Sequence, residues 1–273
     1  MIRVDLHNHT THSHGQSSVE EMYEGGKTAN LEIMGFSEHS PRPPAYSYPT
    51  EYRDHLSATF DQYIKSVQAL NLRKDGPKVL LGLEMDYFPS EEDFIRETIS
   101  RYPFEYIIGG LHFLGTWGFD HSKEDWAPLT DEEKRKHYRE YYETLIQLTQ
   151  SGLMQIVAHP DLIKLFSVDS FREWVEEKDS RELIGKMLLS LKKNNMAMEI
   201  SSAGLRKPCK EIYPGPVLME LAANLGVPIT FASDAHHMGH VAHAFDKLER
   251  YAKDYGYSES RCFYNGAWHN IPF

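Results

Sequence analysis

The stretch VDLHNHTTHSHG, residues 4–15, decides the start of the fold, because an apolar run there passes directly into a group of histidines. Residues 2–6 are mostly apolar, which indicates a short buried strand. His7 and His9 follow, and in an extended chain their spacing of two places both imidazoles on the same side. Two neutral imidazoles on one side are typical ligands of a divalent metal ion. We therefore interpret the stretch as a strand that ends in a metal site, and not as a polar loop that happens to be rich in histidine.

The composition is that of a folded globular protein. With 273 residues, 41% hydrophobic and 25% charged, the chain can bury a substantial core. The net charge of -11 argues against nucleic acid as a partner, since that would call for a basic surface. Cys209 and Cys262 form no CxxC pair, so a thiolate zinc site is excluded. We find no signal core and no membrane span, expect a soluble cytoplasmic protein, and leave open a homodimer.

Strand and helix patterns alternate about seven times along the chain. Strands are predicted at residues 2–6, 31–36, 79–86, 106–113, 153–160, 196–200 and 227–232, and helices at about 18–30, 50–72, 90–102, 130–150, 171–194, 214–225 and 241–255. A long loop is predicted at 115–128 and an irregular tail up to residue 273. This alternation implies a parallel sheet and favours a closed α/β barrel in one domain, 1–273. The alternative is an open doubly wound sheet, but the glycine-rich phosphate loop that such a sheet would carry is absent.

Residues that can bind metal follow nearly every predicted strand. In a barrel these strand ends lie on one face, where catalytic residues collect. Any single one of these residues has an ordinary structural explanation, but chance would scatter the set over helices and both ends of the barrel. The candidate ligands are His7, His9, His14, His39, Glu84, His112, His159, Asp234 and His236.

The number of candidate ligands predicts more than one metal ion. A zinc or iron ion uses about three or four protein ligands, so this set predicts two or three divalent ions. Glu84 and Asp234 are carboxylates and are natural bridges between neighbouring metals. Ligation by nitrogen and oxygen alone is compatible with Zn, Fe or Mn.

A metal cluster without a nucleotide loop or redox thiols favours hydrolysis. Our hypothesis is that a metal-bridging hydroxide attacks a phosphomonoester and that no phosphoenzyme forms. The predicted catalytic residues are Glu84, Asp234 and His236, and the last two are candidates for protonating the leaving alcohol. The phosphate also needs cationic side chains, for which we propose Arg206, Lys164 and Arg42. Each of these three could instead be an ordinary surface charge.

The same residues resemble the PHP (polymerase and histidinol phosphatase) family. The resemblance rests on Asp5-x-His7-x-His9-Thr10, Glu84, His112, His159-Pro160 and Ser233-Asp234-Ala235-His236, and it runs through residue 236. The stretches SAGLRKP (202–208) and IYP (212–214) look more narrowly like the histidinol-phosphatase branch. The resemblance implies a distorted (β/α)7 TIM-like barrel with a trinuclear metal site at the carboxyl ends of the strands.

The resemblance also implies how the ligands divide among the metals. The implied sets are His7, His9, Glu84 and Asp234 for the first metal, Glu84, His112 and His159 for the second, and His14, His39 and His236 for the third. Many family members have Asp where this chain has His14. Asp5 resembles a residue that orients a ligand imidazole from behind.

The implied activity is a single-domain, metal-dependent histidinol-phosphatase of histidine biosynthesis, which hydrolyses L-histidinol phosphate to L-histidinol and phosphate. One alternative is a PHP-type nuclease or phosphoesterase that acts on nucleic acid or nucleotides. The acidic chain has no basic tract, which argues against it. The other alternative is a non-catalytic, metal-stabilised binding domain, and the near-complete ligand set argues against that.

Overall fold

Seven parallel strands form a nearly closed barrel. The computed structural model describes residues 1–273, and its strands follow one another in the order β1-β2-β3-β4-β7-β8-β9. They are β1 (Val4–Asp5), β2 (Ile33–Phe36), β3 (Lys78–Asp86), β4 (Tyr106–Gly110), β7 (Ile156–Val157), β8 (Ala197–Ser201) and β9 (Ile229–Ala232). The two ends of this row meet just after β1 and β9, where the His9 backbone N–H donates to the Ala235 carbonyl at 2.8 Å. The predicted seven-stranded α/β barrel is confirmed.

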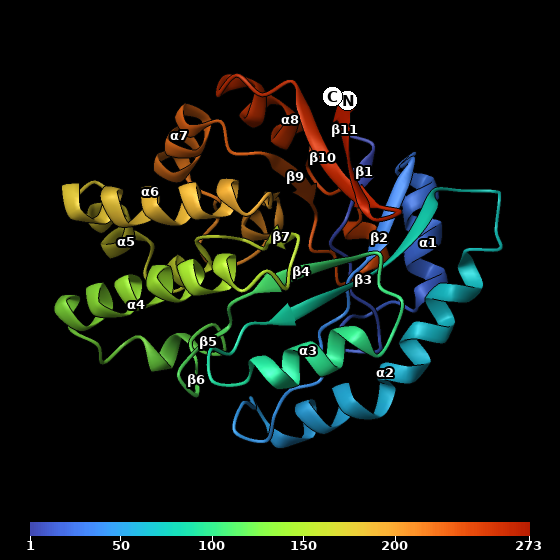
Figure 1. The fold of residues 1–273 in the computed structure, drawn as a ribbon, viewed down its shortest axis with the longest axis horizontal. Helices are drawn as coiled ribbons and strands as arrows, with labels where there is room; N and C mark the ends of the chain where they lie inside the picture. The colour runs from blue at the N-terminus through green and yellow to red at the C-terminus, as the bar shows by residue number, and fades with distance from the viewer.

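Helices surround the strands on the outside (Figure 1). They are α1 (Val19–Thr28), α2 (Thr50–Leu70), α3 (Glu92–Ser100), α4 (Asp131–Gln150), α5 (Val168–Val175), α6 (Lys178–Lys193), α7 (Pro216–Leu225) and α8 (Phe245–Asp254), with short 3-10 turns η1 (Lys123–Asp125), η2 (Leu162–Lys164), η3 (Ala203–Leu205) and η4 (Met238–His240). Helix α1 begins where the sequence predicts, because Ser18 and Glu21 form a reciprocal capping box. None of the helices combines the length and the apolar character needed to cross a membrane.

The apolar core has two layers, a large one between strands and helices and a small one inside the barrel. Tyr106 crosses the inner layer, and its hydroxyl donates to the Leu6 carbonyl at 2.5 Å. A Cβ on Gly35 or Gly82 would lie 2.0 or 2.3 Å from atoms of Tyr106. These two strand glycines therefore leave the space that the tyrosine ring fills.

The C-terminal tail is not irregular, and this prediction was wrong. It forms an antiparallel hairpin of β10 (Glu259–Tyr264) and β11 (Ala267–Pro272), drawn in red in Figure 1. Asn265 and Gly266 make its turn with φ of 52° and 72°, as a tight two-residue hairpin turn requires. Cys262 is buried in the small barrel core, and the Lys78 ammonium lies 3.7 Å from the Tyr264 ring. Because Lys78 opens β3, the hairpin covers the end of the barrel where the strands begin.

Two other segments differ from the prediction. The helix predicted at 171–194 is split into α5 and α6, with Glu177 in an extended conformation between them. The apolar face of α5 ends at Val175, and Lys178 and Glu182 occupy the positions where it would continue. The segment predicted as a loop at 115–128 contains the strand β6 (Trp117–Gly118) and the turn η1. Strand β6 pairs with β5 (Phe113–Leu114) in a small antiparallel hairpin.

Candidate metal centre

The buried Glu84 carboxylate, near the end of β3, lies at the centre of a histidine cluster. Five imidazole nitrogens lie within 3.5 Å of its oxygens, namely His7 Nε2 at 3.3 Å, His9 Nε2 at 3.4 Å, His39 Nδ1 at 2.8 Å, His112 Nε2 at 3.5 Å and His159 Nε2 at 3.0 Å. Together with Glu84 in β3, these histidines come from five strand ends, with His7 and His9 both following β1, so closure of the barrel brings them together.

The remaining three candidate ligands extend the cluster toward the surface. His9 Nε2 lies 3.4 Å from Asp234 Oδ1. The His236 ring centroid is 4.3 Å from that of His9 and 4.2 Å from that of His14. All nine residues predicted as metal ligands therefore gather at one site.

Two of these cluster residues have a strained backbone. His159 has φ of 22° and Asp234 has φ of 49°, in a region that residues other than glycine rarely adopt. Such strain persists only where the surroundings enforce it, and it is typical of functional sites.

Asp5 holds the backbone of this site and not an imidazole, so the role predicted for it was wrong. Its carboxylate accepts backbone N–H groups from Ser233 and Ala242, both at 3.0 Å, and from His7 at 3.4 Å. The Ser233 hydroxyl also donates to it at 2.5 Å. Asp5 therefore fastens the first strand to the loop that carries Asp234.

The donor atoms of the cluster fit divalent cations. Several are buried yet have no hydrogen-bond partner: His7 Nε2, His9 Nε2, His39 Nδ1, His236 Nε2 and Glu84 Oε2. These atoms lie close to one another, but they form no hydrogen bonds. A buried polar atom without a partner costs folding free energy. Shared metal ions would satisfy them. Three groups have donor atoms within 4.8 Å of one another: His7, His9 and Glu84; His39, Glu84 and His112; and His9, His39 and His236. The division among three metals that the resemblance implies stays a prediction.

The charges in the cluster also favour a cation. Burial lowers the pKa of His236 to about 3, which keeps its imidazole neutral and able to bind metal. Burial opposes ionisation of Glu84, but its imidazole neighbours hold its pKa well below the ordinary value. Burial likewise disfavours a charged His7, but Glu199 and Glu84 raise its pKa well above the ordinary value. Positive charge is thus stabilised beside His7, and a metal ion could take the place of the proton.

Three buried carboxylates that we did not identify from the sequence bind imidazoles of the cluster on the side that faces away from its centre. The pairs are Glu199 with His7 Nδ1 at 2.7 Å, Glu38 with His9 Nδ1 at 3.1 Å, and Asp86 with His112 Nδ1. Each carboxylate binds the Nδ1 edge of its ring and leaves Nε2 facing the cluster, which fixes the ring orientation. The signal in the sequence was an acidic residue within or directly after an otherwise apolar strand.

The predicted phosphate-binding Arg206 lies beside the cluster, where it supports a loop. Its Nη2 donates to the carbonyls of Ser233 at 2.6 Å and Asp234 at 3.0 Å, whereas its buried Nη1 has no partner. The next residue, Lys207, was not predicted. Its ammonium lies 3.0 Å from Asp234 Oδ2, and 33% of its side chain is exposed. Lys207 is thus a second cation at the edge of the cluster.

Arg42 lines a pocket of about 440 Å³ whose wall includes the cluster residues His14, His39 and His112. Its Nε donates to Asp86 Oδ2 at 2.5 Å, and its Nη1 is buried without a partner. The structure therefore places Arg42 beside the cluster, although its charge is already paired.

Lys164 lies in a different pocket, of about 350 Å³, between α5 and α7. Only 1% of its side chain is exposed, and its ammonium pairs with Asp161 at 2.7 Å and with Glu211 at 2.9 Å. The structure does not bring Lys164 into the metal cluster with the other predicted residues.

We expect Lys164→Met to lower the free energy of unfolding by ~3–5 kcal/mol, because it leaves the buried Asp161 without its cation. The KM for a phosphomonoester should stay unchanged in the folded protein. Urea denaturation and steady-state kinetics at low temperature measure both quantities, with Lys186→Met on the exposed side of α6 as the matched control. A raised KM with unchanged stability would instead make Lys164 a substrate contact.

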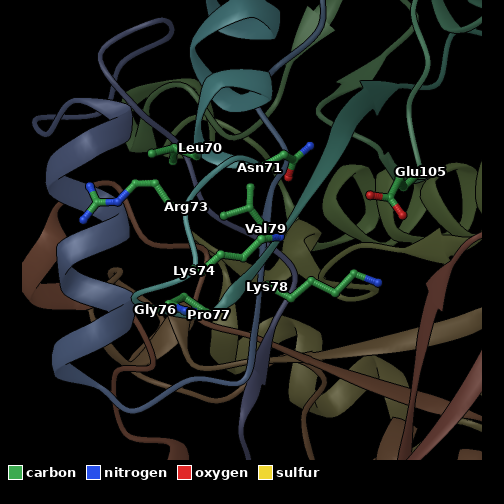
Figure 2. Close-up of a pocket in the computed structure, with 9 residues that line it drawn as sticks. All are labelled: Leu70, Asn71, Arg73, Lys74, Gly76, Pro77, Lys78, Val79 and Glu105. Atoms are coloured by element: carbon green, nitrogen blue, oxygen red, sulfur yellow. The ribbon is translucent and has the colours of Figure 1, made fainter.

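A basic hollow of about 400 Å³ lies at the opposite end of the barrel, at the start of β3 (Figure 2). Its Arg73 points toward α1, where it pairs with Glu20 and with Glu24, and it also pairs with Asp75. No histidine lines this hollow, so it offers no chemistry comparable to that of the cluster.

Comparison with known proteins is consistent with this site. Residues 5–203 match the PHP domain. A Deinococcus radiodurans protein named probable histidinol-phosphatase is 31% identical over 255 residues, which cover 92% of this chain and 93% of that protein. The histidinol-phosphatase of Bacillus subtilis is 28% identical over 269 residues, which cover 92% of this chain and 100% of the relative.

The fold is shared with a solved structure. The histidinol phosphate phosphatase of Lactococcus lactis, crystallised with zinc, L-histidinol and phosphate, superposes with a TM-score of 0.74. The superposition covers 98% of each chain, at 22% sequence identity. At this level of identity the likeness concerns the barrel itself.

Proposed function

Because this chain belongs to the PHP domain family, we propose that it is a metal-dependent phosphomonoester hydrolase and, more narrowly, a histidinol-phosphatase. It hydrolyses L-histidinol phosphate to L-histidinol and phosphate, as a step of histidine biosynthesis. The hydrolase assignment is supported by one observation above all, the five imidazoles around the buried Glu84 carboxylate. The choice of substrate is supported by the two relatives, which are named probable histidinol-phosphatase and histidinol-phosphatase. The match to this chain covers 93% and 100% of their length.

The nine clustered residues hold two or three divalent ions, with Zn, Fe or Mn as candidates. Bound ions would supply positive charge for the phosphate oxygens and would make a water molecule more acidic. Glu199, Glu38 and Asp86 keep the imidazoles in place, so that little reorganisation is needed during the reaction. Lys207 and the free Nη1 of Arg206 add cationic groups at the edge of the cluster, where a phosphate would lie.

A substrate comparison tests this function. Phosphate release is measured from L-histidinol phosphate and p-nitrophenyl phosphate, and cleavage is followed on a single-stranded oligonucleotide. We expect L-histidinol phosphate to have the highest kcat/KM and the oligonucleotide to stay intact. Efficient cleavage of the oligonucleotide would favour a nuclease, and a metal-loaded protein inert to every phosphoester would favour a binding domain.

A further inference from the structure

The pocket beside the metal cluster continues away from it along an aromatic wall. The Tyr52 hydroxyl lies 2.9 Å from Nδ1 of the cluster residue His14. The Tyr52 ring centroid is 6.2 Å from that of Tyr48, and Tyr48 stacks on His121 at 5.1 Å with 19° between the ring planes. These contacts follow one another from the cluster through Tyr52 and Tyr48 to His121.

Arg42 and Phe113 pack against the Tyr48 ring of this wall. The Arg42 guanidinium lies 4.7 Å from the Tyr48 ring centroid and 5.1 Å from that of Phe113. Phe113 stacks on Tyr48 at 5.1 Å, and the Arg42 charge is neutralised by Asp86. The aromatic surface is therefore formed before a ligand binds, which reduces the entropy lost on binding.

One carboxylate lies against the Tyr48 hydroxyl of this wall. Asp120 is the only acidic residue among those that line the pocket, and it accepts the hydroxyl hydrogen of Tyr48. The lining contains no lysine, and its one arginine, Arg42, is paired with Asp86. Asp120 thus places a negative charge, oriented by a neutral hydroxyl, in the pocket whose wall also includes the cluster residues His14, His39 and His112.

We propose that Asp120, Tyr48 and His121 form the subsite for the leaving alcohol: Asp120 binds a cationic nitrogen of the alcohol, and the two rings pack against its heteroaromatic group. The inference rests on the proposed function, since it supposes a phosphate at the cluster. A substrate that carries a phosphate and a cationic, aromatic group matches a pocket whose wall combines cluster histidines with Asp120 and two aromatic rings. Charge-assisted hydrogen bonding and cation–π contact supply the recognition.

The test compares two substrates in the Asp120→Asn variant of the metal-loaded protein. For L-histidinol phosphate we expect kcat/KM to fall ~10- to 100-fold, mainly through KM, because a hydrogen bond to a charged group is lost. For p-nitrophenyl phosphate, which has no cationic nitrogen, kcat/KM should stay within about twofold of the wild-type value, and metal content should be unchanged. Asp125→Asn, on the same loop but outside this pocket, is the matched control.

Tyr48→Phe provides a second variant if Asp120→Asn does not fold. It keeps the ring and removes the hydroxyl that orients Asp120, so we expect a smaller loss, again for L-histidinol phosphate alone. Equal losses for both substrates, or no loss for either, would overturn the subsite. A wild-type protein that hydrolyses p-nitrophenyl phosphate but not L-histidinol phosphate would refute the proposed function itself.

Discussion

Glu84→Gln is expected to lower kcat/KM for phosphate release ~1000-fold and to reduce the amount of bound metal. The substitution preserves the size of the side chain and removes the negative charge that five imidazoles surround. Removing a residue that only orients a ligand costs ~10- to 100-fold, so loss of a central ligand should cost more. Glu84 also belongs to two of the three groups whose donor atoms converge.

The measurement pairs kinetics with metal analysis by mass spectrometry after dialysis. Glu105→Gln makes the same chemical change just before β4, at the other end of the barrel, and should keep both activity and metal. A folded Glu84→Gln protein with wild-type metal content and wild-type turnover would show that Glu84 is not a ligand.

The second large effect is expected from Glu199→Gln, with a loss of ~10- to 100-fold in metal affinity. Glu199 Oε2 binds Nδ1 of His7 at 2.7 Å, and Oε1 accepts the backbone N–H of His159 at 3.1 Å. A carboxylate only accepts hydrogen bonds, so it keeps the proton on Nδ1 and the lone pair on Nε2. A glutamine amide can donate to Nδ1 instead, which permits the opposite tautomer and removes the lone pair from the metal side.

Metal titration of the chelator-treated protein measures this affinity, and the activity at saturating metal separates binding from catalysis. We expect much of the activity to return at high metal concentration, because the ligand His7 is still present. Glu220→Gln, on the exposed side of α7, is the control. An unchanged metal affinity in the folded variant would contradict the positioning role of Glu199.

The barrel and the nine clustered residues were predictable from the sequence for a physical reason. Strand and helix have different periodicities, so their alternation could be recognised, and parallel strands in a barrel place their carboxyl ends on one face. Residues such as His39 and His159 could therefore be placed on that face without knowing any contact. The division of these residues among metals depends on distances of a few ångströms between their donor atoms. Strand order alone does not determine those distances.

Other features depended on contacts between distant residues. Glu199 lies in a strand that looks apolar, and its role appears only when closure of the barrel brings it to His7, 192 positions earlier in the chain. Lys164 follows the cluster residue His159 closely in sequence, but the turn η2 leads it into a buried ion pair away from the cluster. The C-terminal hairpin was missed although Asn265-Gly266 between aromatic residues is a strong local hairpin signal.

We propose that the clustered histidines and carboxylates bind divalent metals and that these metals are needed for phosphomonoester hydrolysis. The most direct test measures metal content and phosphate release from L-histidinol phosphate on the same protein, before chelation, after chelation and after zinc or manganese is added back. We predict two or three ions per chain, loss of turnover on chelation and its recovery with metal. A metal-free protein that retains full turnover would show that hydrolysis at this site does not depend on metal.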